Sequence, residues 1–165
     1  MLRRVALLPF ALLLASPALA DRGELGIDAV ALHLGGDVEP AARLRGGWFI
    51  PDSWVEIEGQ VTRTFGDVAL TTVMAGPSLN IPIELCCGGD DETWSWTLSA
   101  LAGAGKADTP QGAASGLAWQ AGAGVKWHFE DVNLRLEGGW QGAQFGDADA
   151  SGPMLDFGVA FRFGD

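Results

Sequence analysis

Basic residues and histidines are scarce in this chain, and each shortage argues against a class of function. Ten Lys and Arg stand against 21 Asp and Glu, which gives a net charge of −11. An excess of negative charge disfavours nucleic acid as a partner, because little positive charge remains to neutralise phosphates. The only histidines, His33 and His128, fall near opposite ends of the fold predicted below, too far apart to share a metal or a proton relay. We therefore expect no enzymatic activity.

Long hydrophobic runs are also missing beyond the first twenty residues. No later window holds about 18 consecutive apolar residues, which excludes a transmembrane helix. The start of the chain has the layout of a secretory signal: two arginines, an apolar run over Val5–Leu14 and a small-residue cleavage site at Ala18–Ala20. We expect residues 1–20 to be removed, and the loss of both arginines takes the net charge from −11 to −13. Residues 21–165 are then expected to form one domain.

What the chain does have is apolar–polar alternation, clearest over Ala118–Trp140. There the apolar residues share one face of two strands joined by a turn, while Gln120, Lys126 and His128 lie on the other face. Hydrophobic residues make up 48% of the chain, which is high for so acidic a secreted protein. An apolar face with tryptophans near both ends, backed by a charged face, is typical of a strand between lipid and a polar barrel lumen.

Glycine, with 24 residues, separates short alternating segments at fairly regular spacing, which predicts an all-β fold. The segments number about eight, and an even number is required for an up-and-down barrel with both termini on one side. We therefore predict an eight-stranded antiparallel up-and-down transmembrane β-barrel. The predicted strands are Glu24–Gly35, Ala41–Ile50, Trp54–Phe65, Val68–Ile83, Trp94–Gly105, Gly116–Phe129, Asn133–Gln141 and Met154–Phe163.

Two segments fit the alternation poorly. In the first, Val30, Leu32 and Leu34 place apolar residues on the inward face, which predicts either a β-bulge or an inward apolar layer. In the fourth, Pro77 and Pro82 interrupt the ladder, which predicts a shorter strand or an edge-like distortion.

The hairpin between the sixth and seventh segments has two possible turns. A two-residue turn sets Lys126 opposite Arg135, and like charges directly opposite one another are unfavourable. A four-residue turn over Glu130–Asn133 pairs Lys126 with Glu137 instead. We therefore predict the longer turn.

Charged residues on the inward face are predicted to form a network in the lumen. An eight-stranded barrel has an interior about wide enough for side chains, so we expect these charges to pair, because burying an unpaired charge is costly. A gated, narrow ion path is the alternative, and inward glycines such as Gly103 and Gly122 favour it by leaving gaps for water. The predicted network contains Arg43, Arg45, Glu56, Glu58, Lys126, Arg135, Glu137, Asp156 and Arg162.

Aromatic residues on the outward face are predicted to form belts at the two membrane–water boundaries. If the N-terminus lies in the periplasm, the periplasmic belt contains Trp48, Trp94, Trp96, Trp127, Phe129, Phe161 and Phe163. The opposite belt contains Phe65, Trp119 and Trp140. The loops at that opposite end are short, which argues against an adhesin with a large binding surface.

Cys86 and Cys87 are adjacent in a predicted periplasmic turn, where the environment is oxidising. They form either a vicinal disulfide or thiols that pair between molecules. No metal site is predicted, because the neighbouring acidic residues match thiolates poorly and the calcium-like motif at 147–152 lacks its acidic twelfth residue. No cofactor is expected.

The segment Ala118–Glu137 resembles the OmpA/opacity-type outer-membrane β-barrel family, whose strands carry a similar run of the form WQAGAGV, an aromatic, a short acidic turn and LRLE. The closing alternation over Phe157–Phe163 is also similar to that family, although this chain has no Tyr. The resemblance implies a small barrel without a peptidoglycan-binding domain, in the outer membrane of a Gram-negative bacterium. It also implies two partners, outer-membrane lipid and the barrel-insertion machinery, to which Phe163 offers the terminal aromatic.

These features predict a small integral outer-membrane β-barrel with a structural or surface-interaction role, or a narrow pore. Ser95 and Ser99 are expected to face inward, so neither provides a nucleophile on the lipid face. The alternative is a soluble periplasmic or secreted β-barrel that binds a small apolar ligand in its interior. Leu32 and its neighbours favour that alternative, whereas Glu56 and Glu58 on the same face argue against it.

Overall fold

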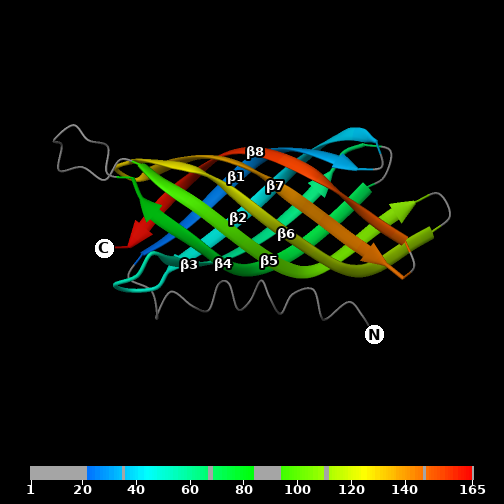
Figure 1. Ribbon diagram of the computed structural model, residues 1–165, viewed down its shortest axis with the longest axis horizontal. Helices are drawn as coiled ribbons and strands as arrows, with labels where there is room; N and C mark the ends of the chain where they lie inside the picture. Colours follow the sequence, from blue (N-terminus) through cyan, green and yellow to red (C-terminus); the bar gives the residue numbers. More distant parts are fainter. Residues whose placement is uncertain are drawn as a thin grey trace.

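The chain folds into a closed barrel in which every strand is antiparallel to its two neighbours. The computed structural model describes residues 22–34, 36–66, 69–83, 94–109, 112–146 and 148–164. Within these residues each strand pairs with the next along the chain, and the last pairs with the first (Figure 1). The predicted eight-stranded antiparallel up-and-down barrel is confirmed. The strands are β1 (Arg22–Leu34), β2 (Asp37–Phe49), β3 (Val55–Thr64), β4 (Ala69–Pro82), β5 (Trp94–Thr109), β6 (Gly112–Phe129), β7 (Val132–Phe145) and β8 (Ala148–Gly164).

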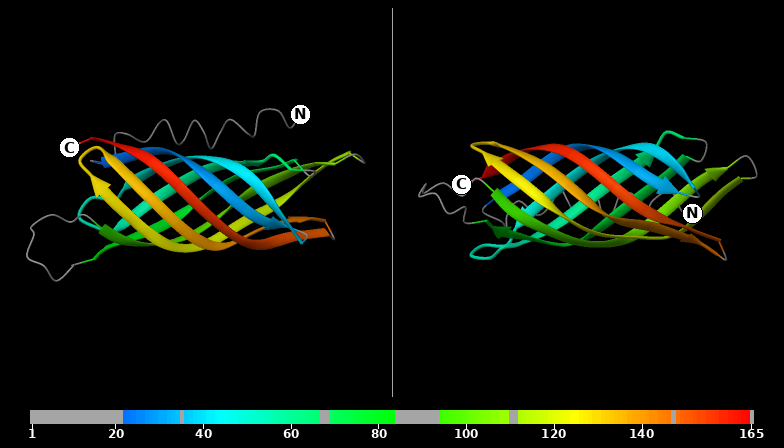
Figure 2. Two further views of the ribbon diagram at one scale, coloured as in Figure 1. Left: turned by 90° about the horizontal axis from the view of Figure 1, so that it is seen from above. Right: turned by 45° about the horizontal axis from the view of Figure 1, so that its top comes forward.

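The barrel has two distinct ends, which we call the base and the tip. The base holds the start of β1 and the end of β8, and the strands run obliquely between it and the tip (Figure 2). Strands β5 to β8 extend further toward the tip than the alternation predicts, so that Lys106 of β5 pairs with Ser115 of β6. The extension is possible because backbone hydrogen bonds continue the ladder through small and polar residues after the apolar pattern has ended.

The hairpin between β6 and β7 differs from the prediction. Phe129 pairs with Val132, so the turn contains only Glu130 and Asp131, and Lys126 lies opposite Arg135. The predicted four-residue turn is therefore wrong. Side-chain partners inside the barrel account for the difference, as described below.

Strand β1 carries an apolar layer on its inner face. Its register with β2 and β8 is continuous, without a bulge. Val30 and Leu32 are buried in one cluster with Ala41 of β2 and Met154 of β8. Of the two arrangements that the sequence allows, the structure thus has the inward layer.

Strand β4 is longer than its prolines suggest. It runs over fourteen residues, and its pairing with β5 is interrupted only between Ala75 and Ser78. Pro77 lies in that interruption and is exposed on the outer wall. The missing N–H of proline therefore causes a local gap in the ladder, and the strand continues on both sides of it.

The outer wall of the barrel is apolar, while charged side chains are buried inside. Trp96 and Phe161 are 55% and 63% exposed on the outside, and Arg43 and Arg45 are each 1% exposed on the inside. This distribution is the reverse of that in a soluble protein, where charged side chains face water. No helix among the described residues is long and apolar enough to cross a membrane.

Candidate functional site: the lumen and its basal mouth

The middle of the lumen is a polar network around Arg43 of β2. The guanidinium of Arg43 binds Asp156 of β8 at 2.5 Å and Gln120 of β6 at 3.0 Å. Its Nε donates to Thr62 of β3 at 3.1 Å. Alternate residues of a strand face the same side, so four strands far apart in sequence deliver these groups to one point. The charge of Arg43 is thereby balanced by protein groups.

Glu24 of β1 is the centre of the basal half of the network. Lys126 of β6 donates to both of its carboxylate oxygens at 3.1 Å, and Asn133 of β7 donates to Oε2 at 2.8 Å. Arg45 approaches Oε1 at 3.3 Å. Lys126 also donates to Glu56 of β3 at 3.1 Å. A buried ion pair is tolerated only when such additional hydrogen bonds offset the loss of hydration.

Arg135 of β7 forms a third group of ion pairs. It binds Glu58 of β3 at 2.7 Å and also Glu137 on its own strand. Ser99 of β5 donates to Glu137 at 2.8 Å. Each of the two opposed cations, Lys126 and Arg135, therefore pairs with two carboxylates, and the two cations share none of them. That pairing removes the reason for preferring the longer β6–β7 turn.

All but one of the predicted lumen charges belong to these three groups. Arg162 is the exception and corrects the prediction, because it is half-buried at the base and lines the mouth of the barrel. It lies two residues before the end of β8, where the inward face of the strand reaches the rim. The residues brought together by ion pairs are Arg43, Arg45, Glu56, Glu58, Lys126, Arg135, Glu137 and Asp156.

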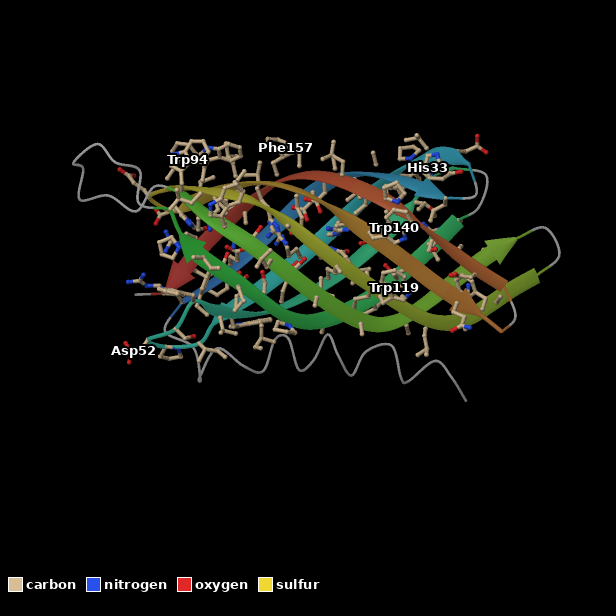
Figure 3. All side chains as sticks on the ribbon, viewed as in Figure 1. His33, Asp52, Trp94, Trp119, Trp140 and Phe157 are labelled. Atoms are coloured by element: carbon tan, nitrogen blue, oxygen red, sulfur yellow. The ribbon has the colours of Figure 1, made fainter. Side chains whose placement is uncertain are left out.

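A cavity of about 540 Å³ opens at the base of the barrel. Among the described residues that line it, Arg22 and Arg162 carry positive charge and Asp52 carries negative charge. Figure 3 shows Asp52 and Trp94 at this end of the molecule. The aromatic side chains that line the cavity are Phe49, Trp54 and Trp94, and further polar groups come from Asn80, Ser95 and His128.

Ser95, His128 and Asn133 form a hydrogen-bonded chain beside this cavity. The Ser95 Oγ lies 3.0 Å from His128 Nε2, and His128 Nδ1 lies 2.8 Å from Asn133 Oδ1. The predicted four-residue turn does not reveal this chain, because it leaves Asn133 outside the β6–β7 ladder, whereas the observed two-residue turn sets Asn133 opposite His128. The sequence signal for the chain is that Ser95, His128 and Asn133 all occupy inward-facing positions on three consecutive strands. His33 lies at the other end of the barrel (Figure 3).

Apolar side chains fill the tip half of the lumen. Leu32 is 0% and Met74 is 2% exposed, so both are fully packed. The sequence predicts such a layer only on β1, because the inward apolar residues of the other strands are spaced among small and polar ones. One cluster contains Leu70, Met74, Leu101, Ala107, Ala118 and Ala143, and the other contains Val30, Leu32, Ala41 and Met154; Leu34 packs against both.

The aromatic residues of the predicted belts lie on the barrel in two groups. Trp94 and Trp127 on adjacent strands pack edge to face, with ring centroids 4.4 Å apart. Such contacts fix the ring positions on the wall. By their positions along the strands, the group nearer the base contains Trp48, Trp94, Trp96, Trp127, Phe129, Phe161 and Phe163, and the group nearer the tip contains Phe65, Trp119 and Trp140. Figure 3 labels Trp94 of the first group and Trp119 and Trp140 of the second.

Solved structures share this barrel. Neisserial surface protein A has 13% sequence identity and a TM-score of 0.62, and covers 86% of this chain and 96% of its own. The N-terminal β-barrel domain of Pseudomonas aeruginosa OprF has 18% identity and a TM-score of 0.54, covering 87% and 98%. The Yersinia pestis outer membrane protein Ail in a phospholipid bilayer nanodisc has 15% identity and a TM-score of 0.52, covering 87% and 99%. The fold is that of the small outer-membrane β-barrels.

At these identities the likeness concerns the fold. No family model matches the chain, and no curated protein sequence matches it either. Within the described parts of the chain, no group of three or more His, Cys, Asp or Glu side chains could hold a metal ion. The expected leader, residues 1–20, and the pair Cys86 and Cys87 lie outside the described residues.

Proposed function

We propose that this chain is a small integral outer-membrane β-barrel with a structural or surface-interaction role. The observation that carries the proposal is the contrast between the two faces of the wall. Exposed Trp, Phe, Leu and Ile side chains cover the outside, while ion-paired Arg, Lys and Glu side chains are buried inside. A lipid environment favours this contrast, because apolar surface of this extent is unfavourable in water.

The proposed location is the outer membrane of a Gram-negative bacterium, reached through a cleaved signal peptide and the barrel-insertion machinery. The similarity of fold to outer-membrane barrels supports the location. The names of two similar proteins support a role at the cell surface. These are Neisserial surface protein A and Ail, the attachment invasion locus protein of Yersinia pestis. The strands of this chain that reach the tip, such as β5 and β6, supply the surface that faces the medium.

A soluble barrel that binds an apolar ligand inside is less well supported. Such a protein needs an apolar cavity, but Leu32 and Met74 are packed against their neighbours. It also needs a polar outside, whereas Trp96 and Phe161 are exposed on the wall. The same two faces therefore argue against this alternative.

Envelope fractionation followed by electrophoresis of boiled and unboiled samples tests the proposal. We expect the protein in the outer-membrane fraction, with the unboiled species migrating faster because the closed barrel resists detergent. Recovery in the soluble periplasm, with no shift on boiling, would contradict the proposal.

A further inference from the structure

The hydrogen-bonded chain at the base has the order of groups found in serine hydrolases. Ser95 of β5, His128 of β6 and Asn133 of β7 lie on three consecutive strands, with the imidazole between the hydroxyl and the amide. Nucleophile, base and orienting group within hydrogen-bond distance of one another are the geometric signature of an activated serine. The arrangement is joined to the ion-paired groups of the lumen at one point, where Asn133 donates to Glu24, and it goes beyond the role proposed above.

Glu24 fixes the proton positions along this chain. A carboxylate only accepts hydrogen bonds, so the Asn133 atom that lies 2.8 Å from Glu24 is the NH₂ donor. The Asn133 carbonyl oxygen therefore faces His128 and requires a proton on Nδ1. Nε2 is then left with its lone pair toward Ser95, and the Ser95 hydroxyl donates to it. This is the tautomer that a general base needs.

Ser95 is 3% exposed and His128 is half-buried, and each borders a space in which a small molecule could bind. Both line the basal cavity of about 540 Å³, a volume within the range of small-molecule sites. Arg162 lines the same cavity, and among the described lining residues the one carboxylate comes from Asp52. Guanidinium groups in a cavity favour an anionic group on the molecule that enters, and they can balance negative charge that develops on a carbonyl oxygen.

We propose that Ser95 is a catalytic nucleophile toward small esters that carry an anionic group. The Ser95 Oγ attacks the ester carbonyl carbon, and its proton passes to His128 Nε2. The bond from the carbonyl carbon to the alcohol oxygen then breaks, and the alcohol leaves with that proton. The acyl group remains on Ser95 until water attacks it by the same path. The proposed site uses His128 alone, so the distance to His33 does not oppose it.

Ser99 provides a matched control four residues along the same strand. It also faces the lumen and is buried, but its hydroxyl donates to Glu137 and it does not line the basal cavity. A Ser99→Ala variant removes an inward serine without touching His128. A loss of ester hydrolysis in Ser95→Ala that is not seen in Ser99→Ala therefore supports the role of the Ser95–His128–Asn133 chain.

The experiment uses the folded full-length mature protein in detergent micelles with two p-nitrophenyl esters, the acetate and the anionic hemisuccinate. We expect release of p-nitrophenol by the wild type and by Ser99→Ala, and none above background by Ser95→Ala. His128→Gln should lower the rate about 100-fold, the usual contribution of a general base. The hemisuccinate should react faster than the acetate, and Arg162→Gln should abolish that preference. Migration of unboiled samples verifies that each variant is folded.

A fluorophosphonate probe gives an independent readout, because attack by Ser95 displaces fluoride and leaves a stable adduct that mass spectrometry locates. Asn133 is a positioning residue, so Asn133→Ala should lower the maximal rate of labelling but not the probe concentration at half-maximal rate. The proposal is wrong if folded wild type carries no adduct on Ser95, or if Ser95→Ala releases p-nitrophenol as fast as the wild type. Equal rates for the two esters would refute the anionic substrate class.

Discussion

At the scale of single residues, the lumen shows how a buried charge is stabilised. Arg43 is hydrogen-bonded to polar side chains of four other strands, which are Thr62 of β3, Gln120 of β6, Gln141 of β7 and Asp156 of β8. Removing one member of such a pair leaves the other charge buried without its partner, which costs far more than losing an exposed pair. Loss of a charged residue is therefore expected to destabilise the barrel more inside the lumen than at the exposed tip.

Replacing Arg43 by Met tests this difference. We expect Arg43→Met to lower the free energy of unfolding by about 3–5 kcal/mol, because Asp156 is left buried and unpaired. The double variant Arg43→Met/Asp156→Leu should recover most of that loss. Urea unfolding in lipid vesicles, followed by tryptophan fluorescence, measures all three.

The exposed pair Lys106–Asp108 at the tip is the matched control. Its side chains are 54% and 42% exposed, and water already screens their attraction. Lys106→Met should change the unfolding free energy by less than about 1 kcal/mol. Equal losses for Arg43→Met and Lys106→Met would contradict the view that burial sets the value of an ion pair here.

At the scale of elements, close approach between strands depends on glycine at particular positions. A Cβ added to Gly124 of β6 would lie 2.2 Å from the carbonyl oxygen of Leu136 on β7. A Cβ added to Gly138 of β7 would meet nothing nearer than 3.9 Å. Neither glycine has a positive φ, so space alone distinguishes them.

The pair of substitutions Gly124→Ala and Gly138→Ala follows from this contrast. We expect Gly124→Ala to destabilise the barrel by about 1–3 kcal/mol, because backbone atoms of β7 must shift. Gly138→Ala should be close to neutral. The midpoint of urea unfolding compares the two, and a larger loss at Gly138 would show that these contacts do not govern strand packing.

The sequence predicts the elements well and their ends less well. Period-two alternation predicts all eight strands and the inward position of Arg43, because each depends only on parity. Parity does not determine turn length, since turns of two and four residues after Phe129 put the same residues inside. The choice depended on the partners of Lys126, and these come from β1 and β3, which no local pattern reveals. The Ser95–His128–Asn133 chain is not predicted from the sequence, because it requires the two-residue turn.

At the scale of the whole molecule, the lumen is filled from the middle to the tip. Ion pairs occupy the middle and basal half, and Leu32, Met74 and Leu101 occupy the tip half. An apolar plug excludes hydrated ions because it offers them no polar partner. We therefore expect that the barrel does not conduct ions.

Planar-bilayer recording tests this expectation. We expect no discrete current steps from the reconstituted protein in molar KCl, because the packed apolar clusters of the tip half offer hydrated ions no polar partner. A protein known to form pores serves as the positive control in the same chamber. Reproducible steps of one size from the folded barrel would instead support the narrow ion path.

The exposed tryptophans report the orientation of the whole barrel relative to lipid. Trp96 and Trp119 stand on the outer wall. Lipids with brominated acyl chains quench tryptophan by contact, so we expect strong quenching in the reconstituted protein, reduced in Trp96→Phe and Trp119→Phe. Unchanged fluorescence would mean that the apolar wall does not face the acyl chains.

Closure of the barrel between β1 and β8 has a consequence for how the chain folds. Joining the first strand to the last fixes the largest loop in the molecule, so its entropic cost is the greatest of any pairing and it is expected to come late. Until then two strand edges remain open to other chains. The ion pairs Arg43–Asp156 and Lys126–Glu24 link residues 113 and 102 positions apart. These ion pairs form only when the barrel is closed with the strands in the correct register. A barrel that closes with β1 and β8 in a shifted register leaves these charges unpaired, and we expect it to reopen.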